Sequence, residues 1–332
     1  MIRISILTSL FLLIGCTKKD LIQIEGRTMG TTYKVLYLPE SNTPEIKVVS
    51  KLVQSILHKV NLKMSTYISE SELSRVNQGP SKKWLGISRD LTNVLLEAQR
   101  TQLLSNGAYD VTIGPLVNLW GFGPKGVRKV PSQQDISNAL KKVGMDKIKI
   151  DKSKSRLYKE LAELNIDLSS LAKGHGVDQV AKNLSGLGVK NFLVEIGGEM
   201  SLKGQKWGRP WKVAIEGPGQ DDGIQKVLSI SDVHMATSGN YRNFFKQDNK
   251  VYSHTLDIKT GRPVPNEIIS VTVLDKTSCM RADALSTALM AMGKSEAIKL
   301  SEKEALISYI IINKGEGQTE IYKSPEFTKL FP

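Results

Sequence analysis

The pattern of apolar and polar positions predicts helices at five places along the chain. Residues 44–62 carry apolar side chains three and four positions apart, which indicates an amphipathic helix. Asp90 is expected to cap a second helix, and Gly293 is expected to close a later one that is rich in Ala, Leu and Met. The expected helices are residues 44–62, 90–104, 135–143, 177–187 and 282–292.

Strands are predicted from short runs of β-branched and aromatic residues bounded by turn residues. They are two strands within 24–38, a hairpin within 146–168, and strands at 192–196, 211–216, 227–230, 233–237, 268–274, 307–313 and 318–322. Because strands and helices do not alternate strictly, the order indicates an α+β fold rather than a doubly wound one. We expect a single large domain with mixed or antiparallel sheets flanked by helices.

The first residues show a different pattern, which is typical of an export signal. Arg3 precedes an almost wholly apolar run over residues 4–14. This run is shorter than the roughly 20 residues that a membrane-spanning helix needs, so it fits the apolar region of a signal peptide. Leu13 and Gly15 before Cys16 resemble the bacterial lipobox, in which the peptide is cut before the Cys and the thiol is diacylated. A plain signal peptide followed by a chance Cys is the alternative.

This pattern divides the chain into three parts and predicts its location. They are a signal peptide at 1–15, the lipidated Cys16 with a short tether at 16–23, and one folded domain at 24–332. The protein is then expected to be anchored to a membrane by its N-terminal lipid and to face the periplasm or the cell exterior. The residue after Cys16 is Thr17 rather than Asp, which in a host with two membranes favours the outer one without deciding between them.

Composition and charge exclude some classes of function. The chain is 40% hydrophobic and 24% charged, an ordinary balance for a globular protein, and its formal net charge is +13. The basic residues are scattered rather than clustered with aromatic ones, so we expect no nucleic-acid binding. A solvated surface near an anionic membrane or the attraction of an anionic substrate accounts for the charge. With Cys16 lipidated, Cys279 has no partner for a disulfide and is expected to be a small buried residue.

Asp283 and Thr287 are the first candidates for chemistry. They are four positions apart in a predicted helix and therefore share a face. A carboxylate beside a hydroxyl offers hard oxygen ligands, which suit Mg²⁺ together with phosphate oxygens. The alternative is structural, with Asp283 as a helix cap and Thr287 bonded back to it.

Two further segments carry candidate groups. In the first, a strand ends at Ser169 and leads into a helix, a turn that attracts phosphate, and Lys173 adds a positive charge there. His175 in the same segment is expected to cap or to pack. In the second segment, His254 and Asp257 are candidate acid and base groups, with a hydrogen-bonded His at a sheet edge as the alternative.

Eight short motifs in a fixed order carry a resemblance that no single motif establishes. They are GTTY (30–33), MSTY with SELSRVN (64–67 and 71–77), YDVTIGPL (109–116), DLS with AKG (167–169 and 172–174), VEIGGE (194–199), ATSGNY (236–241), HTLDIKTG (254–261) and ADALSTAL (282–289). Over nearly the whole mature sequence they resemble the ApbE family, the FAD:protein FMN transferases, many of which are lipoproteins.

The resemblance implies a reaction and a set of ligands. The family cleaves FAD, its substrate, at the pyrophosphate, joins FMN to a Thr or Ser hydroxyl of a target protein through a phosphoester, and releases AMP with the help of Mg²⁺. By resemblance, the metal is held by the side chains of Asp283 and Thr287 and by the carbonyl of Ala172. His254 is the candidate base, and Asp257 orients it or the flavin. The residues implied in FAD binding are Met29, Tyr67, Ala108, Tyr109, Asp110, Ser169, Lys173, His175 and Asp257.

The resemblance also implies partners and leaves alternatives open. The targets would be exported or membrane subunits of redox-driven ion pumps, with an acceptor Thr in a Gly-Thr-containing context. A FAD pyrophosphatase that gives FMN and AMP, or a lipoprotein that binds flavin without turnover, would use the same fold. The chain departs from the family pattern at His175 (usually Tyr), Tyr109 (usually Phe) and Glu195 (often Asn).

Overall fold

The computed structural model describes residues 20–124, 126–217, 223–240, 243–248, 250–265, 267–315 and 317–332. The predicted signal peptide and Cys16 lie outside the described residues. The first strand begins at Ile22, so the last two residues of the predicted tether belong to the folded domain. None of the described helices is long and apolar enough to cross a membrane.

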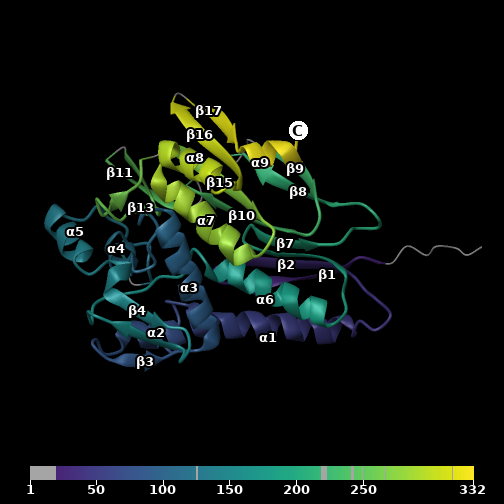
Figure 1. Ribbon diagram of the computed structural model, residues 1–332, viewed down its shortest axis with the longest axis horizontal. Helices are drawn as coiled ribbons and strands as arrows, with labels where there is room; N and C mark the ends of the chain where they lie inside the picture. Colours follow the sequence, from purple (N-terminus) through teal and green to yellow (C-terminus); the bar gives the residue numbers. More distant parts are fainter. Residues whose placement is uncertain are drawn as a thin grey trace, which may run out of the picture.

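An eight-stranded antiparallel sheet forms the centre of the molecule (Figure 1). Its spatial order is β1-β2-β6-β7-β10-β15-β16-β17, and each strand pairs with its neighbours in the antiparallel direction. The bounds are β1 Ile22–Thr28, β2 Thr31–Leu38, β6 Asn191–Ile196, β7 Glu199–Lys203, β10 Val233–Gly239, β15 Ile268–Asp275, β16 Ile307–Gly315 and β17 Gln318–Lys323.

Helices cover one face of this sheet, and a hairpin covers part of the other. Successive side chains of a strand point to opposite faces. Phe192 and Val194 of β6 accordingly pack with α1 (Ile46–Met64) and α6 (Ala172–Gly186), whereas Leu193 packs with β8 and β9. The helices α7 (Cys279–Met292) and α8 (Lys294–Lys303) lie on the helical side as well (Figure 1).

A smaller lobe lies at one end of the molecule (Figure 1). It holds α2 Glu72–Gln78, β3 Trp84–Gly86, α3 Arg89–Leu104, α4 Gly114–Leu119, α5 Gln133–Leu140, a 3₁₀ turn Met145–Lys147, β4 Ile148–Asp151, β5 Arg156–Lys159, β11 Phe244–Gln247, β12 Lys250–Ser253, β13 Leu256–Asp257 and β14 Arg262–Pro263. The hairpin of β8 (Trp211–Glu216) and β9 (Ile224–Ile230) and the helix α9 (Pro325–Leu330) instead pack on the other face of the large sheet. The α+β prediction is confirmed, with antiparallel sheets flanked by helices.

Several predicted boundaries were wrong, each for an identifiable reason. Ser88, not Asp90, caps α3, because its hydroxyl accepts the backbone N–H of Leu91. The predicted hairpin within 146–168 ends at Lys159, and the chain beyond it crosses the lobe as a loop. Short helices such as α2 and α4 escape prediction because they are too brief to show an apolar period.

The helix α6 begins at Ala172, five residues before the predicted start. Two glycines in its first turns, Gly174 and Gly176, lower the helix propensity of this segment and hide it from a sequence pattern. The structure shows why Gly174 is there. A Cβ at this position would lie 2.6 Å from the carbonyl oxygen of Cys279, in α7. Glycine therefore allows α6 and α7 to pack in close contact.

Hydrogen bonds fix the two helices in both directions. Asp178 of α6 accepts the N–H groups of Cys279 (2.8 Å) and Met280 (3.0 Å) at the start of α7. In return, Asp283 of α7 accepts the N–H of Gly174 (3.0 Å) in the first turn of α6. Such side-chain acceptors satisfy backbone N–H groups that a helix leaves without partners at its N-terminus. Cys279 itself is buried and free, as expected.

We predict that Gly174→Ala lowers the free energy of unfolding by about 2–3 kcal/mol, because its methyl group forces the two helices apart. Urea unfolding followed by circular dichroism measures this loss. Gly186→Ala is the matched control: it lies in the same helix, and a Cβ there meets no atom within 4 Å. The control is expected to be neutral or to gain up to about 1 kcal/mol. Equal losses in both variants would contradict the packing argument.

Candidate active site

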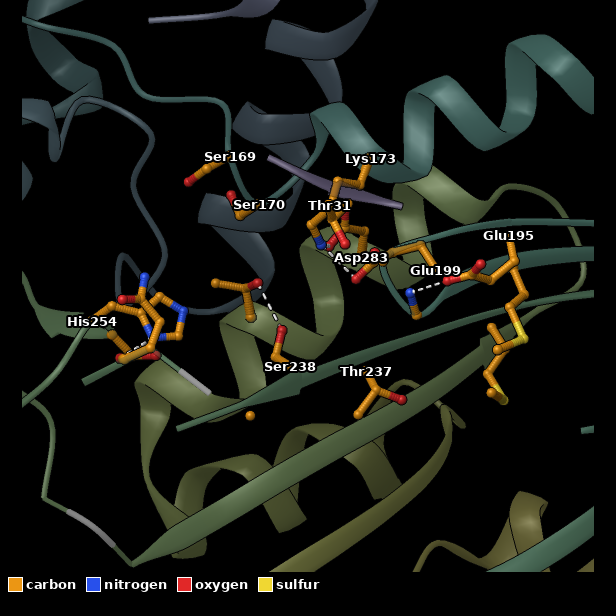
Figure 2. A pocket seen from close by; sticks show the side chains of 18 of the residues that line it. Thr31, Ser169, Ser170, Lys173, Glu195, Glu199, Thr237, Ser238, His254 and Asp283 are labelled. Carbon is orange, nitrogen blue, oxygen red and sulfur yellow. Dashed lines mark hydrogen bonds and ion pairs between the residues drawn. The ribbon is translucent and has the colours of Figure 1, made fainter. Parts of the chain in front are cut away.

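A cavity of about 700 Å³ opens between the large sheet, the first turns of α6, the middle of α7 and the loop before α4 (Figure 2). Polar side chains from widely separated parts of the chain converge on it. The predicted site residues that line it are Ala108, Tyr109, Asp110, Ser169, Lys173, His254, Asp283 and Thr287. The fold thus brings eight predicted residues to a single cavity.

A buried cluster of charges lies in the middle of this cavity. Lys173 Nζ lies 2.6 Å from Glu199 Oε1 and 3.9 Å from Asp283 Oδ1. The two carboxylates are almost completely buried, and Lys173 is 28% exposed. Burial raises the pKa of Glu199 and of Asp283, although Lys173 opposes the effect. Burial alone would lower the pKa of Lys173, but the two carboxylates outweigh it and raise that pKa.

Asp283 and Thr287 both face the cavity, and the structural alternative for them was wrong. Ser278 caps α7, and its hydroxyl accepts the N–H of Arg281. Ser286, rather than Thr287, bonds back to the carbonyl oxygen of Asp283 (2.9 Å). The hydroxyl of Thr287 instead lies 3.0 Å from the hydroxyl of Ser238 in β10. The helix spacing therefore presents a carboxylate and a hydroxyl together, as predicted.

These oxygens fit a Mg²⁺ ion that is completed by phosphate. Glu199 Oε2 is buried and makes no hydrogen bond to another described residue, so a hard cation would find an acceptor there. The described residues hold no group of three or more His, Cys, Asp or Glu side chains able to bind a metal by themselves. Mg²⁺ does not need one, because it usually takes one or two carboxylates and obtains its other ligands from water and substrate phosphates.

The loop before α4 forms another wall of the cavity. Asp110 is buried and accepts hydrogen bonds from the Thr112 N–H (2.7 Å), the Thr112 hydroxyl (2.6 Å) and the Met145 N–H (2.9 Å). Burial raises its pKa in spite of these bonds. The hydroxyl groups of Tyr109 and Ser170 lie 2.8 Å apart. Asp110 thus fixes the loop that carries Ala108 and Tyr109 to the cavity.

His254 stands at one end of the cavity, directly after β12 (Figure 2). Its ring nitrogen Nδ1 lies 3.0 Å from the backbone carbonyl oxygen of Asn243. A carbonyl can only accept, so this contact places the proton on Nδ1 and leaves a lone pair on Nε2. Burial lowers the pKa of His254, and the bond to Asn243 opposes this only in part. The ring is therefore suited to accept a proton at Nε2.

Five predicted residues do not line the cavity. Asp257 holds its own turn, accepting the Lys259 N–H (2.8 Å) and the Thr260 hydroxyl (2.9 Å). Tyr67 is 71% exposed, and its hydroxyl donates to the Phe122 carbonyl oxygen at 3.2 Å. His175 is buried, and its Nε2 has no hydrogen-bond partner among the described residues. The other two are Met29, at the β1–β2 turn, and Ala172, the first residue of α6.

Sequence reasoning assigned no role to Glu199, although it stands in the quoted VEIGGE motif, and it gave Ser238 only a part in shaping a loop near the ligand. Glu199 is the first residue of β7, directly after the turn at Gly197 and Gly198. The β6–β7 register places it opposite Ile196, and only this pairing brings its carboxylate under Lys173. An acidic residue that follows two glycines at a hairpin turn was the available signal.

The fold and the cavity define a class of protein, a single α+β domain with a polar site suited to a metal and phosphate. The match to a family model narrows the class. The model described as "ApbE family" matches residues 29–311, and the chain belongs to this family. It is 43% identical over 325 residues to the FAD:protein FMN transferase of Vibrio cholerae, covering 97% of this chain and 96% of the relative. With the Haemophilus influenzae FAD:protein FMN transferase the identity is 43% over 314 residues, 92% of this chain and 90% of the relative.

Solved structures agree with this assignment. The flavin transferase ApbE from Vibrio cholerae superimposes with a TM-score of 0.87 at 41% identity, covering 94% of this chain and 99% of that chain. The apo form of the Pseudomonas stutzeri flavinyl transferase ApbE also gives a TM-score of 0.87, at 38% identity and with 94% and 97% coverage.

We predict that Lys173→Met, measured in EDTA, lowers the free energy of unfolding by about 3 kcal/mol at pH 8, because two buried carboxylates lose their cation. The loss should be smaller at pH 5. Without Lys173, the folded-state pKa values of Glu199 and Asp283 rise further above their unfolded values. At low pH both carboxyls are protonated and burying them costs little. As pH rises through the folded-state pKa values, the free energy of unfolding falls, because burial then opposes ionisation.

The matched control for this prediction is Lys299→Met. Its ion pair with Glu296 (2.7 Å) is exposed on both sides, so its removal should cost less than about 1 kcal/mol. Urea titrations at the two pH values measure both variants. A loss for Lys173→Met that stays below 1 kcal/mol, or that does not depend on pH, would contradict the buried-cluster argument.

Proposed function

We propose that this protein transfers FMN from FAD to a Thr or Ser hydroxyl of a target protein and releases AMP. The observation that carries the proposal is the convergence of Lys173, Asp283, Thr287 and His254 on one cavity in a chain of the ApbE family. The relatives that are 43% identical over more than nine tenths of this chain are named for this activity.

Mg²⁺ is part of the proposal. Asp283 and Thr287 would hold it with their side chains, and Ala172 with its carbonyl oxygen. When bound, the ion would neutralise charge on the pyrophosphate oxygens, which is the main requirement of phosphoryl transfer. Lys173, whose pKa is raised by its carboxylate neighbours, adds a permanent positive charge beside the same place.

Side chains of this protein would accept the proton and hold the flavin during the transfer. The acceptor hydroxyl oxygen bonds to the FMN phosphorus, the bond from that phosphorus to the bridging oxygen breaks, and AMP leaves with that oxygen. The hydroxyl proton passes to Nε2 of His254, the ring nitrogen that the Asn243 bond leaves unprotonated. Tyr67 is exposed at the surface and suited to stack on the flavin ring.

The test uses FAD, Mg²⁺ and a peptide with a Thr in a Gly-Thr-containing context. We expect the peptide to gain the mass of one FMN unit on that Thr, with AMP released in equal amount. EDTA and Asp283→Ala should each lower the rate by about 100-fold or more, because charge neutralisation is lost. Asp151→Ala is the control, since this carboxylate serves an exposed turn with Arg156 and should leave the rate unchanged. Mass spectrometry and AMP quantification measure both products.

The other outcomes are distinct. Free FMN and AMP with an unmodified peptide would replace the transferase by a FAD pyrophosphatase. Unchanged FAD, with flavin fluorescence reporting binding, would indicate a flavin carrier. Retention of full activity in Asp283→Ala would contradict the role given to α7.

We further propose that the protein is exported, anchored through a lipid on Cys16, and faces the periplasm or the cell exterior. The support is the pattern of residues 1–16. Exported or membrane subunits of redox-driven ion pumps would then be its targets, because tethering to one surface raises the effective concentration of enzyme and acceptor.

Cys16→Ala, given a cleavable signal, should leave the transfer rate on a soluble peptide within about twofold of the wild type. It should move the protein from the membrane fraction to the soluble one, because acyl chains are needed for stable anchoring. Fractionation and the peptide assay measure the two effects separately. Loss of activity on the soluble peptide would show that the anchor does more than localise the enzyme.

A further inference from the structure

Two segments that are remote in the sequence meet at His254, at one end of the cavity. One is the loop after α4, which carries Phe122 and Arg128. The other is the β11–β12 hairpin, with Asn243 directly before β11 and His254 directly after β12. A ring contact joins the segments: Phe122 meets His254 edge-on, with ring centroids 6.3 Å apart.

Arg128 clamps the two segments together. Its Nη1 donates to the carbonyl oxygen of Phe244 at 3.0 Å, and its Nη2 donates to Oδ1 of Asn243 at 2.8 Å. The guanidinium carbon lies 5.5 Å from the centre of the Phe122 ring. The planar fork of Arg suits two acceptors at once and also stacks on aromatic rings, which a Lys ammonium cannot reproduce.

Asn243 links this clamp to the catalytic candidate. Its backbone carbonyl oxygen lies 3.2 Å from the backbone nitrogen of His254 and 3.0 Å from ring nitrogen Nδ1. Arg128 binds the side chain of Asn243 itself and the backbone carbonyl of the next residue, Phe244. The position of one carbonyl therefore decides which nitrogen of His254 carries the proton, and Arg128 fixes the segment around that carbonyl.

The loop that presents Arg128 is preorganised by its own packing. A Cβ on Gly126 would lie 2.2 Å from the Cα of Gly121, so the loop closes on itself in a way that only glycine permits. A third bond, from the Val130 N–H to Oε1 of Gln247 (3.1 Å), also joins the loop to the hairpin. The guanidinium is thus held between two fixed points although it faces solvent.

We propose that Arg128 is a positioning residue for His254: by fixing Asn243 it holds the histidine in the Nδ1–H tautomer, with the Nε2 lone pair free. The proposal deepens the transferase function, since it rests on His254 as the proton acceptor. The charged groups that act on His254 are Lys173, Arg128 and Asp167, and the first two disfavour its protonation.

The first test reads the tautomer directly, without substrate. The chain has four His residues, so a ¹⁵N spectrum of the apo protein with labelled histidine contains four imidazoles, and His254→Gln assigns the signal of interest. We expect the wild type to show a protonated Nδ1 and an unprotonated Nε2 at pH 8. Arg128→Gln and Arg128→Lys should shift both signals toward the average of two tautomers, because neither variant can hold both acceptors. Lys129→Gln, an exposed neighbour, is the matched control and should leave the spectrum unchanged.

The second test measures transfer with the same variants. We expect both Arg128 variants to lower kcat by about tenfold with the KM for FAD within about twofold, since a misplaced base slows proton transfer but not binding. Circular dichroism melts within about 2 °C of the wild type would confirm that the fold is intact.

Unchanged His254 signals in both Arg128 variants would overturn the proposal, and so would a slower rate without any change in the tautomer. A shifted tautomer in a protein whose wild type transfers no FMN would support the clamp while refuting the proposed function. The two failures are therefore distinguishable.

Discussion

The close contact between α6 and α7 is the constraint on which the site depends. Asp178 of α6 accepts backbone N–H groups from the first turn of α7, and Asp283 of α7 accepts one from the first turn of α6. Each helix therefore satisfies N–H groups that the other leaves without a partner. The contact requires Gly174, because any side chain there would strike the backbone of α7. One residue, Asp283, therefore serves both the packing of the helices and the cavity.

This double use explains why a buried charge cluster is tolerated. Two buried carboxylates without a cation would be strongly unfavourable, and Lys173, directly before Gly174, supplies the cation. The first turn of α6 thus positions a glycine for packing, an N–H for Asp283 and an ammonium for Glu199. Glu199 reaches the cluster from the sheet, so the geometry of the cluster also depends on the β6–β7 register. A bound Mg²⁺ would add charge to a place where the protein has already arranged its acceptors.

The other end of the cavity follows a different principle. The His254 ring is held by a carbonyl, an aromatic edge and a loop that Arg128 joins to the β11–β12 hairpin, not by direct ion pairs among the described residues. Burial keeps the imidazole neutral over a wider pH range, and the carbonyl selects its tautomer. Charge is concentrated at Lys173, Glu199 and Asp283, where phosphate would be bound, and a neutral base is kept at the end where a proton would be removed.

The sequence by itself determined the α+β class, the long helix at α1, and the shared face of Asp283 and Thr287, because apolar periodicity and a spacing of four are local properties of one element. It also supplied the ordered motifs that identify the ApbE family. Only the tertiary structure decided that α6 begins at Ala172, that Glu199 pairs with Lys173, and that Asn243 holds His254. Each of these depends on a contact between separate elements, such as Gly174 against α7, and no local pattern encodes it. The close approach of two backbones overrides the low helix propensity of glycine, and a strand register decides which acidic side chain is buried.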